Sequence, residues 1–318
     1  MVLTTALSSC ISRRPGEGEE TSKDMDQLLE EIKQDMENSG MEGGEVVAAV
    51  IYKAYDDHAE VIGCELPMGS VSILAEFEGK KVTKIADNAF QGMNAVTEVI
   101  LPDSIESVGE KAFMSCVALT SVQMPASLKT IGRYAFYGCV ALTNVEIGAG
   151  VESVGENAFG SCIALPAISV EDGNKNFAAE NGVLFSADKA TLVQYPAGKA
   201  DASYTIPESV KTVNNFAFSY AKALTAVDTS NVTSLGDYTF SSCAALAEVK
   251  LGSGLTMIGA GTFQKCTALK SIEIPEGITA LGYKNDAGAE CGASFYGCSA
   301  LASVSLPSTI KNIGVVTK

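Results

Sequence analysis

The sequence of 318 residues contains no tryptophan and a single histidine, His58. One histidine excludes histidine-rich metal sites and most pairings of a nucleophile with a histidine base. Basic residues are also few: 22 Lys and Arg stand against 38 Asp and Glu, for a net charge of −16. Binding nucleic acid through its phosphates requires a basic face, so we expect no nucleic-acid partner. No apolar run reaches the roughly 18 residues of a membrane-spanning helix.

What the sequence does contain is an internal repeat. A phenylalanine, in most copies preceded by Ala or Thr, recurs at spacings of 23, 23, 23, 59, 22, 23 and 32 residues. The two long spacings equal one period plus insertions of 36 and 9 residues. The recurring phenylalanines are Phe90, Phe113, Phe136, Phe159, Phe218, Phe240, Phe263 and Phe295.

One copy of the repeat reads Ile131-Gly-Arg-Tyr-Ala-Phe-Tyr-Gly-Cys-Val-Ala-Leu142, followed by the alternating stretch Thr143-Asn-Val-Glu-Ile147. The alternation predicts a short strand with one apolar face, ended by the Gly or Pro that follows. A unit this small buries its apolar face only by stacking on identical neighbours. We therefore expect a spine of stacked Phe rings, with the Ile-Gly pair at a corner that leaves no room for a side chain.

These in-register copies, over roughly residues 66–314, resemble the BspA-like branch of leucine-rich repeats. The resemblance implies a mainly β leucine-rich-repeat solenoid, with short strands stacked in a parallel sheet and an irregular, turn-rich convex side. It also accounts for the 36-residue insertion, since long repeats of this family carry a hairpin. Here the hairpin is expected near 171–203, with strands at 183–186 and 191–195 joined by a turn at 187–190.

The domain organisation follows from composition. The solenoid takes residues 86–318, in about eight coils, and 46–85 is expected to be its amino-terminal cap. Residues 11–45 carry 11 acidic and 4 basic side chains and form an acidic linker, with a short helix expected from about Asp24 to Glu37. Leu7-Ser-Ser-Cys10 resembles a bacterial lipobox, so residues 1–10 are interpreted as the remnant of a lipoprotein signal, with Cys10 as the lipidated residue.

Most of the nine cysteines occupy one column of the repeat, three residues after the Phe. A metal–thiolate ladder or stacked disulfides would be the chemical interpretation of this column. Parallel stacking, however, holds neighbouring Cβ atoms about as far apart as the coils, longer than the ~3.8 Å that a disulfide prefers. Met93 and Ala221 stand in the same column, so we expect buried free thiols that pack as small apolar groups. The column consists of Cys116, Cys139, Cys162, Cys243, Cys266 and Cys298.

The strand residues that point away from the core form two rows across the coils. Solenoids bind partners through such extended surfaces. The rows are polar and mildly acidic, and they lack aromatic residues to act as binding hot spots. A solvated sheet face is therefore the alternative interpretation. The candidate protein-binding residues are Glu98, Ser121, Gln123, Asn144, Glu146, Asp228, Glu248, Lys250, Ser271 and Glu273.

Catalytic signatures are not evident in the sequence. The acidic residues are spread over the repeats, and no complete nucleotide-binding or calcium loop is present. We expect no enzyme, no cofactor and no metal site. We expect a monomeric solenoid at the cell surface that binds protein ligands and is attached to a membrane only through a lipid anchor. The resemblance implies that it serves adhesion to host or bacterial surface proteins. The alternative is an extracellular structural spacer without a dedicated partner.

Overall fold

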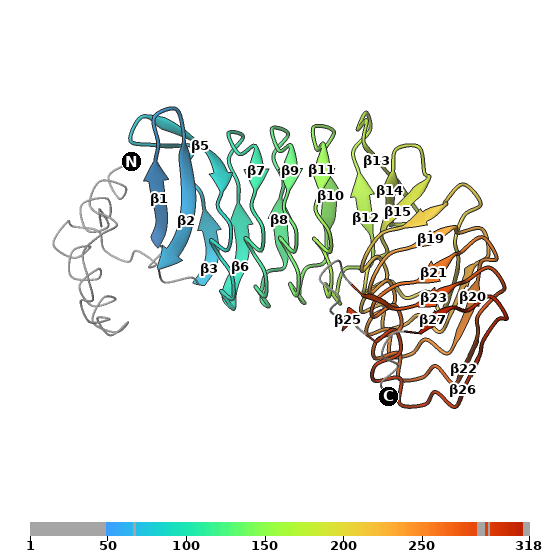
Figure 1. Cartoon of the computed structure of the whole chain (residues 1–318). Coiled ribbons are helices and arrows are strands. Elements are labelled where there is room, and N and C mark those ends of the chain that lie inside the picture. The colour runs from blue at the N-terminus through green and yellow to red at the C-terminus, as the bar shows by residue number, and fades with distance from the viewer. Residues whose placement is uncertain (1–48, 66–67, 285–289, 292, 314–318) are drawn as a thin grey trace.

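The computed structural model describes residues 49–65, 68–284, 290–291 and 293–313. Across these residues the chain is a mainly β solenoid with parallel stacked strands and no helix, which confirms the fold class expected from the repeat (Figure 1). The segments 1–10 and 11–45, with the expected helix and Cys10, lie outside the described residues.

Each regular coil contributes two strands rather than the one that the sequence predicted. The first, here called the row strand, follows the Leu that stands six residues after the spine Phe in most coils, and it pairs in parallel with at least one neighbouring row strand. The row strands are β3 (Met68–Ser72), β6 (Ala95–Ile100), β8 (Ser121–Gln123), β10 (Val145–Ile147), β12 (Ile168–Val170), β16 (Ser203–Thr205), β18 (Ala226–Thr229), β20 (Glu248–Leu251), β22 (Ser271–Glu273) and β26 (Ser303–Ser305).

The second strand, here called the corner strand, ends in most coils at the apolar residue before the Gly corner. Each corner strand pairs in parallel with at least one neighbouring corner strand. Most corner strands are only two residues long, too short to show an alternating pattern in the sequence. The corner strands are β5 (Lys80–Ile85), β7 (Ser107–Val108), β9 (Thr130–Ile131), β11 (Ser153–Val154), β15 (Thr191–Gln194), β17 (Thr212–Val213), β19 (Ser234–Leu235), β21 (Met257–Ile258), β23 (Ala280–Leu281) and β27 (Asn312–Ile313).

A hairpin stands at the amino-terminal end of the corner-strand stack. Strands β1 (Ala49–Ala54) and β2 (Ala59–Glu65) are antiparallel, and β2 continues the stack by pairing in parallel with β5. The short β4 (Glu76–Phe77) pairs with the start of β5. At the other end, β24 (Tyr283–Lys284) and β25 (Glu290–Cys291) form a small antiparallel pair within the nine-residue insertion.

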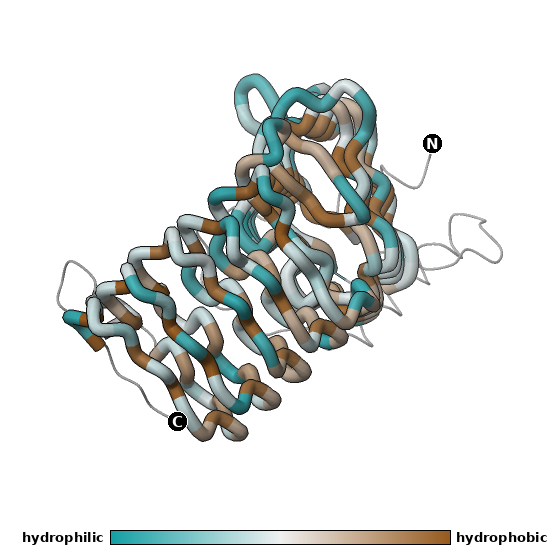
Figure 2. The backbone as a smooth tube through the Cα atoms, turned by 90° about the vertical axis from the view of Figure 1, so that its right-hand side faces the viewer, coloured by the Kyte–Doolittle hydropathy of each residue, from teal (hydrophilic) through white to brown (hydrophobic). Residues whose placement is uncertain are grey.

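A stack of aromatic rings runs through the core, as the repeat predicted. Phe136 is fully buried, and its ring lies 5.1 Å from that of Phe113 and 5.5 Å from that of Phe159. Apolar residues recur at the same place in successive coils, which Figure 2 shows as repeated brown segments along the tube. Each coil thus buries its rings against its neighbours, which is how a short repeat forms a continuous core.

The corner glycines are required by close backbone approach. A Cβ atom built on Gly132 would lie 2.5 Å from the carbonyl carbon of Gly109, the corner residue of the preceding coil. The same crowding holds one coil later, where a Cβ on Gly155 would lie 2.4 Å from the backbone nitrogen of Arg133. Side chains cannot fit at distances this short, so the corner requires glycine.

The long insertion contains the missing member of the ring stack. Tyr195 is buried and stacks on Phe218 at 4.9 Å, and β15 and β16 on either side of it pair in register with β17 and β18. The insertion before it adds β13 (Phe177–Glu180) and β14 (Val183–Ser186), an antiparallel pair, and β14 also pairs with β15 across the turn at 187–190.

The insertion divides the molecule into two arms. The buried apolar residues form two clusters that meet in the insertion, where Leu184 belongs to the first cluster and Val183 and Phe185 belong to the second. The coil stack changes direction at this point, as Figure 1 shows where the yellow strands begin. We refer to residues 49–170 as the first arm and to residues 195–313 as the second arm.

Candidate functional site

The candidate binding residues lie in two rows on the outer side of the row strands, and neighbouring coils bring them side by side. The strand register sets Glu98 opposite Ser121, and it sets Asp228 opposite Lys250. Ser121 and Asp228 are half-buried, and the other candidate residues are exposed. The remaining register pairs that include a candidate are Ile100 with Gln123, Glu146 with Ser169, Ala226 with Glu248, Ser271 with Ser303, and Glu273 with Ser305.

The insertion interrupts these rows, which the repeat pattern alone predicted to be continuous. In the first arm the last row strand, β12, packs beside β13 and β14 of the insertion. The row strands of the second arm start again as a separate sheet, in the order β16-β18-β20. The candidate surface therefore consists of two half-rows, one on each arm.

The chemistry of the half-rows is polar and acidic with few fixed contacts. Lys250 is the one basic side chain among the candidates, and its Nζ lies 3.1 Å from Oδ2 of Asp228. Glu98 accepts a hydrogen bond of 2.9 Å from the hydroxyl of Ser70. Ile100, 45% exposed, adds an apolar side chain at the start of the first half-row. Such a surface can form hydrogen bonds and ion pairs with a partner, and it offers no nucleophile–base pair.

The cysteine column is buried, and every cysteine in it is a free thiol. The structure adds a role that spacing did not reveal. Each thiol donates a hydrogen bond to the carbonyl oxygen of the spine Phe in the preceding coil, as from Cys139 to Phe113 at 3.1 Å. That carbonyl also accepts the backbone N–H of Cys116 in its own coil. Burial raises the pKa of the Cys116 thiol to about 12, so the thiol stays protonated and remains a donor.

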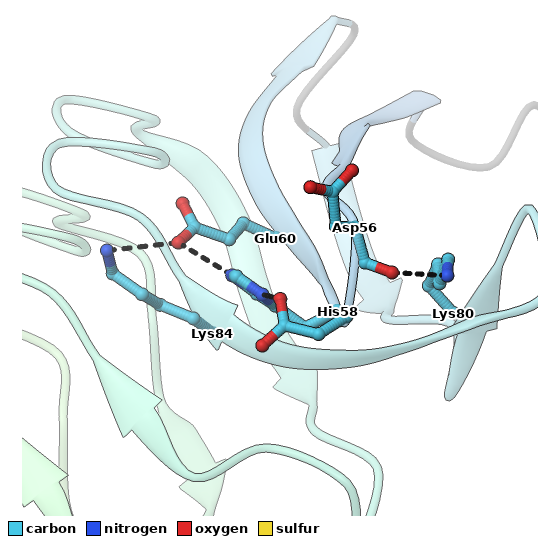
Figure 3. Close-up of polar contacts among 6 residues, drawn as sticks. Asp56, His58, Glu60, Lys80 and Lys84 are labelled. Carbon is cyan, nitrogen blue, oxygen red and sulfur yellow. Dashed lines mark hydrogen bonds and ion pairs between the residues drawn. The ribbon is translucent and has the colours of Figure 1, made fainter.

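His58 lies in the turn between β1 and β2, within a network of charged groups (Figure 3). Its Nδ1 lies 2.6 Å from Oδ1 of Asp57, and its Nε2 lies 3.4 Å from Oε1 of Glu60. The hydrogen bond to Asp57 raises the pKa of His58 above its ordinary value. Lys84 of β5 reaches the same oxygen of Glu60 at 3.2 Å. The network ties the turn to β5, and both ring nitrogens face carboxylates.

Metal-binding geometry is not found in the part of the chain that the structure describes. None of its His, Cys, Asp and Glu side chains gather in a group of three or more that could hold an ion. The same residues include no helix with the length and apolarity to cross a membrane.

The aromatic residues that the rows lack are found elsewhere on the surface. Tyr134 of the first arm and Phe216 of the second arm meet with their ring centroids 6.0 Å apart. Both are half-buried and stand two residues before the spine Phe, a loop position that holds Asn, Lys, Gly, Ala or, at Tyr238, another aromatic residue in other coils. The sequence shows that these loops carry aromatic residues, but only the bend between the arms brings Tyr134 and Phe216 together.

Comparison with known families decides what kind of repeat this is. A model of the BspA type leucine rich repeat region matches six copies, over residues 75–183, 200–287 and 290–316. The chain belongs to this BspA-type family. The matched ranges cover the phenylalanine rings of both arms. They leave out residues 184–199, which hold Tyr195.

Solved structures agree on the fold. A leucine-rich repeat protein from Eubacterium ventriosum is 22% identical, with 81% of this chain and 82% of that chain covered and a TM-score of 0.56. The pneumococcal vaccine antigen PcpA is 19% identical, with 84% of this chain and 94% of that chain covered and a TM-score of 0.53. Comparison with curated proteins gives no match.

Proposed function

We propose that this BspA-type solenoid is a non-enzymatic, monomeric surface protein that binds protein ligands and serves adhesion to host or bacterial surface proteins. The observation that carries the proposal is the pair of half-rows. Their side chains are mostly exposed, held in register by the strand pairing, and largely unused by contacts within the chain. Rigid spacing of adaptable polar groups over several coils is how solenoids recognise extended protein surfaces.

The acidic character of the half-rows points to the chemistry of the partner. The rows hold Glu98 and Glu146 on the first arm, and Glu248 and Glu273 on the second arm. Lys250 is already paired with Asp228. A partner with basic residues at matching spacing is therefore favoured, because complementary charges steer association and reject like-charged surfaces.

Site-specific photo-crosslinking on cells that carry the full-length gene tests the proposal. A photoreactive amino acid replaces Asn144 in one variant and Ser271 in another, one on each half-row. The matched controls carry it at Glu152 and Thr256, which are also exposed but lie in the turns before the corner strands. We expect a protein adduct of the same mass from both row positions and none from the controls.

The possible results separate the alternatives. If neither row position gives an adduct, the protein acts as a spacer without a partner and the proposal is wrong. If the control positions give adducts in equal yield, the partner does not bind at the rows. Glu146→Lys and Glu273→Lys, each combined with the photoreactive site on its own arm, are expected to reduce the adduct yield.

The attachment to the cell is the second part of the proposal. Cys10 in Leu7-Ser-Ser-Cys10 is the expected lipidated residue, and the acidic residues 11–45 would hold the solenoid away from an anionic membrane surface. Cys10→Ala in the full-length gene is expected to move the protein from the membrane fraction to the soluble fraction. A Cys10→Ala protein that still sediments with membranes would show that the lipid-anchor assignment is wrong.

A further inference from the structure

The two arms touch through the loops that follow their corners, although the insertion and the coil of Tyr195 separate these loops in the sequence. The hydroxyl oxygens of Tyr137 and Tyr220 lie 2.9 Å apart. The Ser219 hydroxyl lies 3.3 Å from Oδ1 of Asn157. These pairs are separated by 83 and 62 residues, whereas neighbouring coils in the regular repeat are about 23 residues apart.

Aromatic rings and one charged network complete the contact. Tyr134 meets Phe216 at 6.0 Å and 69°, an edge-to-face arrangement that aromatic pairs favour. The guanidinium of Arg133 lies 4.7 Å from the ring centroid of Tyr134, and its Nε donates to Glu156 at 2.9 Å. Glu156 in turn accepts a hydrogen bond from Nδ2 of Asn215. We call the following residues the junction cluster: Arg133, Tyr134, Tyr137, Glu156, Asn157, Asn215, Phe216, Ser219 and Tyr220.

The insertion itself explains why these loops can meet. In a regular coil the spine ring comes five residues after the last corner-strand residue in the ladder, as from Val213 to Phe218. From Leu192, which is in register with Val213, to Tyr195 it is three residues. The coil of Tyr195 is thus two residues short on the loop side. The extra strands β13 and β14 lie on the side of the coil that carries the strands, where β14 pairs with β15 and both extra strands pack beside β12. A coil that is thick on one side and thin on the other acts as a wedge in the stack.

The backbone of the junction cluster indicates that its aromatic residues are held in place by contacts with their surroundings. Tyr134, Phe216 and Tyr220 all have left-handed φ angles, of 56°, 58° and 62°. This region is unfavourable for bulky residues and suits Asn or Gly. At the position of Tyr134 and Phe216, two residues before the spine Phe, other coils hold Asn88 and Asn157, with φ values of 60° and 56°. Tyr238 is a third aromatic residue at this position, and its ring stacks on that of Phe216 at 5.0 Å. At the position of Tyr220, two residues after the spine Phe, most other coils hold Gly or Ser. Bulky residues in left-handed backbone persist where their surroundings over-determine them.

We infer that the junction cluster is a lock that fixes the direction of the second arm relative to the first. The wedge-shaped coil starts the bend, and the contacts between the loops hold it at one angle. The inference does not depend on the proposed function. Its consequence for that function is that a partner meets the two half-rows in a preset relative orientation.

Substitution by asparagine distinguishes a lock between the arms from local backbone strain. Loss of a lock lowers the melting temperature and loosens the bend, whereas relief of strain raises the melting temperature and leaves the shape unchanged. In the double variant Tyr134→Asn and Phe216→Asn, the new residues suit the left-handed backbone but cannot make the contact between the arms. The matched control is Lys111→Asn, with a left-handed φ of 55° in the same column and a side chain that pairs with Glu110 of its own arm at 2.8 Å. Small-angle X-ray scattering reports the shape, and thermal unfolding by circular dichroism reports stability.

If the lock exists, the double variant shows a broader pair-distance distribution with a larger maximum dimension, and its unfolding separates into two transitions. The Lys111→Asn control keeps the parent profile and melts at the same or a higher temperature. A double variant with the parent scattering profile and an equal or higher melting temperature overturns the inference, because it shows only relief of local strain.

A gentler variant covers the case in which the double variant does not fold. Tyr137→Phe removes the hydrogen bond to Tyr220 and keeps the ring. We expect a smaller change of the scattering profile in the same direction and a lower melting temperature. If Tyr137→Phe leaves both the scattering profile and the melting curve unchanged, the contact does not hold the arms and the inference is wrong.

Discussion

Tyr195 is the one spine ring with a hydroxyl group among the described residues, and removing that oxygen atom should make the protein more stable. The side chain is fully buried, stacks on Phe218 at 4.9 Å and 23°, and meets Tyr204 edge-on at 5.1 Å. Its hydroxyl group is buried without a hydrogen-bond partner among the described residues. Burial is also the main reason why the pKa of Tyr195 lies above its ordinary value. The stack thus contains a hydroxyl group that loses its hydrogen bonds to water on folding and gains none from the described residues.

The expected size of the effect follows from that lost hydration. An unsatisfied buried hydroxyl costs about 1–3 kcal/mol, and Tyr195→Phe removes it while the ring keeps its stacking partners. At about 2–4 °C per kcal/mol for a protein of roughly this size, the variant should melt several degrees above the parent. Thermal unfolding followed by circular dichroism measures the shift, and denaturant midpoints check it under milder conditions.

The reverse substitution provides the control. Phe113→Tyr places a hydroxyl into a part of the stack where both neighbouring rings, of Phe90 and Phe136, are phenylalanine. It should lower the melting temperature by a comparable amount. If Tyr195→Phe is less stable than the parent, the hydroxyl has a favourable interaction, and the reasoning from an unpaired group is refuted.

Two further predictions concern the regular coils. Phe136→Ala should destabilise the protein by about 3–5 kcal/mol, because it opens a cavity in a fully buried stack, and the damage should spread to adjacent coils; an unchanged melting curve would contradict the spine. The cysteine column should make the protein sensitive to alkali and inert to thiol reagents while folded. The pKa of the Cys116 thiol is about 12 in the folded protein and about 8.5 in the unfolded chain. The thiol therefore contributes its full stabilisation below about pH 8.5 and loses it as the pH rises toward 12. The free energy of unfolding falls by about 1.4 kcal/mol per pH unit for each such thiol. Urea midpoints between pH 7 and 11 measure the slope, and Cys116→Ala, matching Ala221 of the same column, should reduce it.

The half-rows show how far a repeat pattern can predict a surface. Alternation in segments such as Thr143-Asn-Val-Glu-Ile147 placed Glu146 outward, and the period placed it beside its counterparts in neighbouring coils. Both follow from local rules, because each coil contacts the next at a fixed sequence distance. The break between the half-rows did not follow, because the pattern gives no orientation for a coil that departs from the period.

The sequence by itself determined the repeat, the buried ring of each regular coil, the glycine corners and the burial of the cysteine column. These features recur every 23 residues or so, and stacking identical units leaves each residue type few places to go. Tertiary structure alone decided that Gln194-Tyr195 replaces the usual Ala-Phe pair, that thiols donate to the spine carbonyls of the preceding coil, and that Tyr137 meets Tyr220 across the bend. The physical reason is range: a period encodes contacts between neighbouring coils, whereas a contact across 83 residues depends on the shape of the irregular coil between its partners.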